Sequence, residues 1–384
     1  EYFQLINKSR VKDIPVESEF NTNEYSRKID YQTLKHIDIN LQNYKQKNNL
    51  IDYTDMINKF VRESEKSPTF DVIFIDEAQD LSPIQWRMFD VLKTKTKDIY
   101  MAGDDDQAIF AWAGADVNRF INEPADNKFL DESQRVPRAI QEKANEWISR
   151  IPEKKRIKKK WDPRKDKNGD IVIGRQESIY SLDNVNLSSG EWLILARTNS
   201  RIRKIGEELK AKSLYYETKK GKSYDARLYK SILSWTRWNK GELITLMECK
   251  DIFDYLDFEF NEKLFKNKEL IGMEEVGFQK GVVWFDMFTR ADANEKLYIR
   301  TMLSTGEKLS ISARIRLQTI HSTKGEEENN VILVMDNTSK IRESTTNNNE
   351  KLYEEHRIFY VGATRAKQNL YLLKAKIERK GYPI

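Results

Sequence analysis

The chain has 384 residues, a formal net charge of +5 and a composition in which one third of the residues are charged, a length that suffices for two or three domains. One cysteine, Cys249, excludes a disulfide framework, and three scattered histidines do not support a zinc site. No apolar stretch approaches the length of a membrane span and no signal-peptide pattern is present. We therefore expect a cytoplasmic protein without a membrane partner.

Residues 1–65 are polar and have the pattern of helices, with Tyr44, Leu50, Ile57 and Phe60 at roughly helical spacing. Helical character is therefore the expectation for the whole of this segment.

The apolar run Val72–Ile75 ends in two adjacent acids, Asp76 and Glu77. Four apolar residues in a row predict a strand that is buried on both faces of a parallel sheet, and ligands bind at the carboxyl ends of such strands. Asp76 is then placed to hold hydrated Mg²⁺, and Glu77 to orient or deprotonate an attacking water. Taken alone, such a pair is more often a turn or the start of a helix.

A second short strand is predicted at Asp98–Met101, and it opens into a turn of glycine, acids and an amide. Gln107 in this turn can sense a γ-phosphate or its attacking water through its side-chain amide. Trp112 offers a flat aromatic face near the same loop.

The next predicted elements are a strand from Phe129 through Arg135, a helix from near Pro137 to Ile151 and a buried strand at Trp192–Ala196. A helix at residues 200–212 follows, after which alternating strands are expected to stop until Ile315–Ile320.

The stretch 213–310 is rich in Trp, Phe and Lys and has helical periodicity, which favours aromatic side chains in a core over a base-stacking surface. Residues 344–349 are interpreted as an exposed loop.

The densest basic run is Lys154–Trp161. One interpretation is salt-dependent contact with nucleic-acid phosphates, with the tryptophan stacking on a base. The other, which we favour, is a solvated loop after the preceding helix. Lys219–Lys222 leaves the same two alternatives open.

Five blocks of the sequence resemble, in order, motifs II to VI of the UvrD/Rep family of superfamily 1 helicases, and they are residues 72–80, 98–115, 130–135, 319–327 and 360–367. Residues 50–57 also resemble the segment that this family carries shortly before motif II. The resemblance covers roughly residues 45 to 375. Five ordered blocks rarely coincide by chance.

The resemblance implies an α/β fold with two RecA-like parallel-sheet motor domains, the first one incomplete, and mainly helical insertions. Residues 1–65 then belong to a helical insertion of the first motor domain, and 66–124 to the remainder of that domain. The second motor domain is expected at 125–212 and 311–384, with an accessory insertion at 213–310.

The resemblance also implies roles for residues of the nucleotide site. In the family, the arginines that correspond to Arg135 and Arg365 reach across the cleft to the γ-phosphate, where guanidinium groups stabilise developing charge. Glu327 falls where the family places a carboxylate on the nucleotide sugar, and Lys324 and Gly325 complete that loop.

Contact with single-stranded DNA is expected from three residues. Trp112 can stack on a base without regard to sequence, and Thr319 and His321 can donate to backbone phosphates. For His321, a satisfied interior imidazole is the alternative.

The chain departs from the family pattern at several positions. Ser133 and Gln134 stand where the family usually has Asn and Tyr, and Ala113 stands where it has Arg. Glu326 replaces a leucine and Glu328 an aromatic residue, so the packing around Glu327 must differ.

The phosphate-cradling string G-x-x-x-x-G-K-[ST] does not occur in the 384 residues. We therefore expect a truncated polypeptide that binds nucleotide weakly or not at all, or a loop that lies in a separate chain.

The function that this pattern predicts is an ATP-dependent DNA helicase that uses ATP and Mg²⁺, moves 3′→5′ on single-stranded DNA and acts at junctions of single- and double-stranded DNA. The polarity comes entirely from the resemblance. The alternatives are a motor-like subunit of a helicase–nuclease complex and an ATPase-deficient DNA-binding remnant. Residues upstream of Glu1 would separate these, because a Gly-Lys-Thr or Gly-Lys-Ser loop supports the motor. Pathway and protein partners are not indicated by the sequence.

Overall fold

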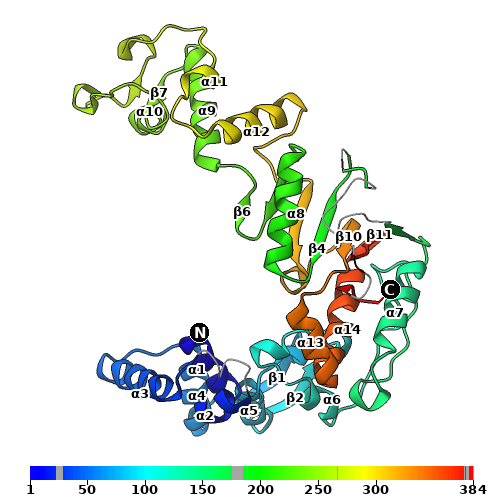
Figure 1. Cartoon of the computed structure of the whole chain (residues 1–384). Helices are drawn as coiled ribbons and strands as arrows, with labels where there is room; N and C mark the ends of the chain where they lie inside the picture. The colour runs from blue at the N-terminus through cyan, green and yellow to red at the C-terminus, as the bar shows by residue number, and fades with distance from the viewer. Residues whose placement is uncertain are drawn as a thin grey trace. The chain divides into compact units, whose positions relative to one another are not determined.

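The computed structural model describes residues 1–22, 29–174, 185–187, 189–265, 267–375, 377 and 380–383, and its elements are labelled in Figure 1. The chain divides into two compact units. Unit 1 comprises Glu1–Gly169 and Thr338–Arg365, and unit 2 comprises Asp170–Asn337 and Ala366–Ile384. The motor-domain boundaries expected near 65, 124, 212 and 310 stay predictions.

The described part of residues 1–65 contains four α-helices, which confirms the helical character predicted there, and residues 23–28 of that prediction lie outside the described residues. The helices are α1 (Tyr2–Val11), α2 (Val16–Thr22), α3 (Tyr31–Lys47) and α4 (Tyr53–Arg62). Helix α4 begins at a capping box in which the side chains of Asp52 and Asp55 each accept from the other's backbone N–H. Arg10 and Lys45 bind both carboxylates, which ties α1 and α3 to the start of α4.

Two parallel strands follow the short turn η2 (Ser64–Lys66). They are β1 (Phe70–Ile75) and β2 (Thr96–Met101), and α5 (Pro83–Lys93) connects them. Both predicted strands are confirmed. The prediction that the first is buried on both faces is wrong: Phe74 is 78% exposed and stacks on Tyr100 with ring centroids 5.2 Å apart. In the described part of the chain this sheet has only these two strands, and the face that carries Phe74 and Tyr100 is exposed.

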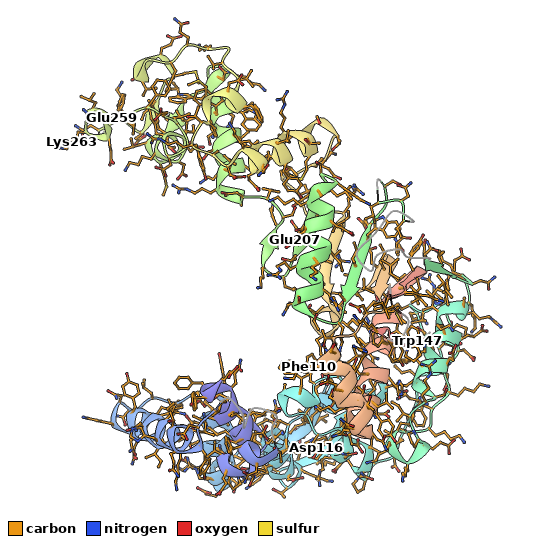
Figure 2. The ribbon with its side chains drawn as sticks, in the orientation of Figure 1. Phe110, Asp116, Trp147, Glu207, Glu259 and Lys263 are labelled. Atoms are coloured by element: carbon orange, nitrogen blue, oxygen red, sulfur yellow. The ribbon has the colours of Figure 1, made fainter. Side chains whose placement is uncertain are left out.

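The rest of unit 1 consists of short helical turns and longer helices. These elements are η3 (Ala78–Asp80), η4 (Asp105–Gln107), η5 (Ala111–Ala113), α6 (Val117–Asn122), α7 (Arg138–Ile148), η6 (Glu153–Lys155), α13 (Ser339–Asn347) and α14 (Asn349–Ala363). Helix α7 follows Pro137, as predicted, and packs on α14 through an edge-to-face contact between Trp147 and Phe359. Figure 2 labels Trp147 among the side chains.

Two predictions for unit 1 are wrong. Residues 129–135 form no strand, because their pairing is limited to an isolated bridge between Glu132 and Asp162. Residues 344–347 are the last turn of α13 and not a loop, and Asn348 caps the next helix by accepting from Glu350 N and Lys351 N. Polar residues such as these are favoured both in loops and at helix ends, so composition alone did not separate the two.

Unit 2 contains a seven-stranded sheet in the order β3-β11-β10-β4-β9-β5-β6. Its strands are β3 (Asp170–Gly174), β4 (Trp192–Ala196), β5 (Tyr216–Thr218), β6 (Gly221–Lys222), β9 (Ile315–Thr319), β10 (Glu328–Val334) and β11 (Ala366–Leu373). All pairs are parallel except β5–β6. Every residue of β4 is buried, as its apolar run predicted, and α8 (Asn199–Ala211) follows it.

The expectation that strands stop after Ala196 is wrong, since β5 extends the sheet beside β9. The mostly parallel sheet and the many helices make the chain an α/β protein.

The remainder of unit 2 is mainly helical. It contains α9 (Ala226–Asn239), β7 (Ile244–Thr245), α10 (Leu246–Phe253), η7 (Glu262–Phe265), β8 (Leu270–Ile271), η8 (Glu274–Val276), α11 (Trp284–Met287) and α12 (Ala293–Ser304). Trp235 and Trp238 on α9 are fully buried, and Trp235 contacts Phe278 and Phe288 edge to face. The prediction that these aromatics form a core is confirmed.

Cys249 lies in this core as a free thiol, and burial raises its pKa to about 12. Among the described residues, no helix combines the length and apolar character needed to cross a membrane.

Candidate nucleotide site

The acid pair lies in a tight turn at the carboxyl end of β1. Glu77 has a φ of +53°, a left-handed conformation that costs a non-glycine residue about 1–2 kcal/mol. The turn is held on both sides: Asp76 Oδ1 accepts from Glu77 N at 2.8 Å, and Ala78 N donates to Ala102 O at 3.0 Å, just beyond the end of β2. Both carboxylates are exposed. They can therefore accept a hydrated cation and a water.

Gln79, two residues further on, is completely buried between two loops. Its Nε2 donates to Glu77 Oε2 at 2.6 Å, and its Oε1 accepts from Asp104 N at 2.9 Å. The sequence reasoning missed this residue. The available signal was an amide two positions after the acid pair.

Gln107 is held from two sides. Its Nε2 donates to Asp104 Oδ2 at 2.6 Å, and its Oε1 accepts from Arg365 Nη2 at 3.0 Å. Arg365 follows helix α14, is 1% exposed, and also donates through Nε to Val361 O. Gln107 and Arg365, which are 258 positions apart in the chain, thus contact each other through the Gln107 amide.

Arg135 approaches the same end of α14, with Nη1 at 3.5 Å from Thr364 O. Unit 1 therefore brings together the residues predicted at Gln107, Arg135 and Arg365. Glu77 connects to them through Gln79 and Asp104, and Asp76 contacts the backbone N–H of Glu77.

Three consecutive acids, Asp104, Asp105 and Asp106, have carboxylate oxygens within 4.8 Å of one another, a spacing that suits a metal ion. Cations of the chain bind them instead. Lys159 Nζ lies 2.6, 2.5 and 3.1 Å from the three carboxylates in order, and Arg156 makes two hydrogen bonds to Asp106.

These ion pairs correct the interpretation of the basic run. A solvated loop is wrong for Arg156 and Lys159, which hold the turn that carries Gln107. The spacing of residues in the sequence does not predict charge pairs of this kind, because the partners lie 50 or more positions apart.

The charges around the turn shift one another's pKa values. Burial alone raises the pKa of the Asp104 carboxyl, but Lys159 and the amide of Gln107 outweigh it and lower that pKa below its usual value. Burial and the neighbouring acids raise the pKa of Asp106. Burial would lower the pKa of Lys159, yet the three carboxylates raise it. The three carboxylates therefore favour the cationic form of Lys159.

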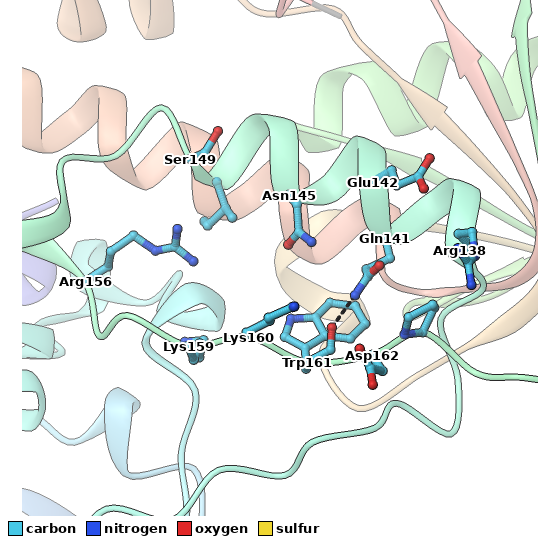
Figure 3. Close-up of a pocket in the computed structure, with 12 residues that line it drawn as sticks. Arg138, Gln141, Glu142, Asn145, Ser149, Arg156, Lys159, Lys160, Trp161 and Asp162 are labelled. Atoms are coloured by element: carbon cyan, nitrogen blue, oxygen red, sulfur yellow. Dashed lines mark hydrogen bonds between the residues drawn. The ribbon is translucent and has the colours of Figure 1, made fainter.

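A cavity of about 380 Å³ lies between α7 and the segment that contains Lys159 to Pro163 (Figure 3). Gln141 Nε2 donates to Trp161 O across its floor. None of the site residues predicted from the motif blocks lines this cavity, whereas Arg156, Lys159, Lys160 and Trp161 of the basic run do.

Trp112 in unit 1 is 54% exposed, and its ring lies 6.4 Å from that of Phe110. A face that accessible can stack on a base.

In unit 2, Thr319 caps η9 (Ile320–Thr323) by accepting from Ser322 N. Burial, with a contribution from Arg197, lowers the pKa of His321 to about 4. The imidazole is neutral near pH 7, so it can donate through one N–H but carries no charge toward a phosphate.

The loop at Gly325 has a φ of +83°, which suits glycine. Glu327 lies 3.6 Å from Lys367 Nζ. Arg316 explains both departures from the family pattern beside it, because its guanidinium binds Glu326 at 2.9 Å and Glu328 at 2.8 Å. Charge pairing thus replaces the apolar packing that leucine and an aromatic residue would supply.

The parallel sheets and the acid pair at the end of β1 are consistent with RecA-like helicase domains. Residues 3–128 match the UvrD/REP helicase N-terminal domain, and residues 289–376 match the UvrD-like helicase C-terminal domain. The chain belongs to the UvrD/Rep helicase family.

Among individual proteins, the chain is similar to the ATP-dependent DNA helicase PcrA of Staphylococcus epidermidis, with 29% identity over 217 residues. PcrA of Staphylococcus aureus is 27% identical over the same length. Each match covers 50% of this chain and 29% of the relative. The matched region therefore spans less than a third of these relatives' length.

Proposed function

We propose that the chain is part of an ATP-dependent DNA helicase that hydrolyses ATP and moves along single-stranded DNA, and that it supplies residues of the nucleotide site but not the phosphate-cradling loop. The observation that carries the proposal is the pair of hydrogen bonds made by the Gln107 side chain. Its amide donates to the Asp104 carboxylate and accepts from the buried guanidinium of Arg365. In the proposed mechanism, these contacts connect a γ-phosphate sensor, Gln107, to an arginine finger, Arg365.

The residues present fit magnesium and ATP. Asp76 supplies an exposed carboxylate, the oxygen ligand that hydrated Mg²⁺ prefers, and ATP supplies the phosphorus that water attacks. Glu77 orients this water and takes its proton. Gln107 places its amide beside the γ-phosphate, and Arg135 and Arg365 stabilise the charge that develops there.

Other assignments complete the proposal. Lys324, Gly325 and Glu327 hold the nucleotide sugar, and Trp112, Thr319 and His321 contact DNA. The shared sheet of β3, β4 and β9 to β11 supports a second motor domain built from residues of 125–212 and 311–384, around an accessory insertion at 213–310. Residues 66–124 then belong to the first motor domain and 1–65 to its helical insertion.

The test is Glu77→Gln in the protein as its gene produces it. Loss of the base should lower DNA-stimulated ATP turnover by about 10²- to 10⁴-fold, while binding to single-stranded DNA stays largely intact. Glu63→Gln is the matched control, because Glu63 lies at the surface of the same unit and pairs only weakly with Lys66. Normal turnover in Glu77→Gln would remove Glu77 from the mechanism.

Direction of movement needs its own measurement. Duplexes with a single-stranded tail on either the 3′ or the 5′ side should be unwound only from the 3′ tail. Unwinding from the 5′ tail would overturn the proposed 3′→5′ polarity and leave the ATPase assignment untouched.

A further inference from the structure

Gln79 is a fully buried polar side chain that joins two loops at the carboxyl ends of β1 and β2. A buried amide is costly unless its donor and its acceptor are both satisfied. Both are: Nε2 donates to the Glu77 carboxylate, and Oε1 accepts from the backbone of Asp104. The side chain therefore has one well-defined orientation.

The backbone at Gly103 packs closely against this amide. A Cβ on Gly103 would lie 2.7 Å from Gln79 Oε1 and 2.7 Å from the ring of Phe120, so only glycine fits there. Ala102 N donates to Ile75 O at 2.7 Å and Ala78 N to Ala102 O at 3.0 Å, which joins the two loops on the near side. The loops and the amide form one packed unit.

We propose that Gln79 is a positioning residue for hydrolysis: its N–H fixes the Glu77 carboxylate, and its carbonyl ties that carboxylate to the turn that carries Gln107. The inference rests on the proposed role of Glu77. A carboxamide suits this position because it offers a donor and an acceptor at once. An ionised glutamate would offer only acceptors and would face Glu77 with like charge.

The chemical difference between amide and carboxyl supplies the test. In Gln79→Glu, the introduced carboxyl group replaces the amide that donates to the Glu77 carboxylate. Two carboxyl groups this close titrate as a coupled pair, and one of their pKa values is raised. When the pair holds a proton, the introduced carboxyl group can donate to Glu77 as the amide did. When both groups are ionised, repulsion displaces Glu77.

We expect Gln79→Glu to lose about tenfold or more of its ATP turnover at about pH 8.5, and to recover most of it, relative to the unmodified protein, as the pH falls to about 6. The loss should fall on kcat more than on KM, because Gln79 acts through Glu77 and not on the nucleotide. Gln79→Met cannot titrate, so its loss should not recover at low pH. A residue with a merely structural role would show no such recovery.

A second readout does not depend on ATP. The raised pKa in the folded state means that Gln79→Glu is least stable at high pH and gains stability as the pH falls through that value. Thermal unfolding across this range measures the effect. Gln46→Glu is the matched control, since Gln46 is exposed on α3 and undergoes the same chemical change.

The outcomes separate the claims. If the melting temperatures of Gln79→Glu and Gln46→Glu respond equally to pH, Gln79 does not face Glu77 and the inference is overturned. If stability follows pH but turnover of Gln79→Glu does not, the positioning role is overturned. An unmodified protein without ATP turnover would refute the proposed function, and the stability measurement alone then decides whether Gln79 holds Glu77.

Discussion

Replacing Lys159 by methionine tests the ion cluster that holds the Gln107 turn. The side chain of Lys159 is 14% exposed, and its ammonium contacts three carboxylates, two of which are 1% exposed. Methionine fills nearly the same volume without the charge. The variant therefore leaves Asp105 and Asp106 buried with fewer partners and little change in packing.

Breaking a buried ion pair by removing one partner costs about 3–5 kcal/mol, because the remaining charge stays desolvated. Here the loss is partly offset. Arg156 still binds Asp106 through two hydrogen bonds, and Ile157 N still donates to Asp105 Oδ2 at 2.9 Å. We therefore expect the lower end of the range, about 3 kcal/mol near pH 7.

The pH dependence follows from the same charges. Lys159 lowers the pKa of Asp104, a stabilising effect that is present above the unfolded-state pKa and is lost as the pH falls through the lower folded value. Without Lys159 the folded-state pKa values of Asp104 and Asp106 rise, so the variant takes up protons and its deficit shrinks as the pH falls toward the ordinary range of aspartate.

Urea unfolding followed by tryptophan fluorescence measures the deficit. The control is Lys158→Met, one residue away, since Lys158 is 85% exposed and its partner Glu153 is 81% exposed. That change should stay within about 0.5 kcal/mol. If Lys159→Met and Lys158→Met shift the unfolding free energy equally, the cluster does not stabilise the turn and the reasoning is wrong.

Two further predictions concern other parts of the chain. Burial, with a contribution from nearby arginines, lowers the pKa of His356 to about 4, so the fold favours the neutral imidazole and loses stability as the pH falls from the unfolded value of 6.5 toward 4. His356→Gln should flatten the pH dependence of the urea midpoint in this window, and His321 should account for a further part of that dependence. An unchanged slope would contradict this. Trp235→Ala should cost about 3–5 kcal/mol because Trp235 is 1% exposed in an aromatic core, against less than about 1 kcal/mol for the 43% exposed Leu233→Ala on the same helix. Equal melting temperatures for these two variants would show that the core does not depend on the tryptophan.

The elements that were predicted correctly are those whose pattern is local. The runs at 72–75 and 192–196 form strands, and Pro137 precedes a helix. Of the two strands, only β4 is buried along its whole length, because β10 and β9 flank it and α8 packs beside it, whereas β1 has one partner among the described residues. An apolar run therefore predicted the strand but did not predict whether neighbouring elements would bury it.

The errors arise where structure depends on partners that are distant in sequence. Residues 129–135 have a pattern that is typical of a strand. The segment nevertheless pairs through only one isolated β-bridge, and Leu130 is 90% exposed. The short strand β5 has little pattern of its own and exists because β9, about 100 positions later, offers an edge. Lys159 and Gln79 were missed for the same reason, since their partners are visible only in the folded chain.

Four successive hydrogen bonds connect the motif residues of unit 1. Glu77 to Gln79, Gln79 to Asp104, Asp104 to Gln107 and Gln107 to Arg365 are joined at 2.6, 2.9, 2.6 and 3.0 Å. A displacement of the C-terminal end of α14 must either break one of these bonds or carry Glu77 with it. The bond from Asp104 N to Gln79 Oε1 involves no charged group and is worth about 0.5–1.5 kcal/mol, less than the other three, so it limits the coupling to about that amount, which matches the lower range of coupling energies between sites.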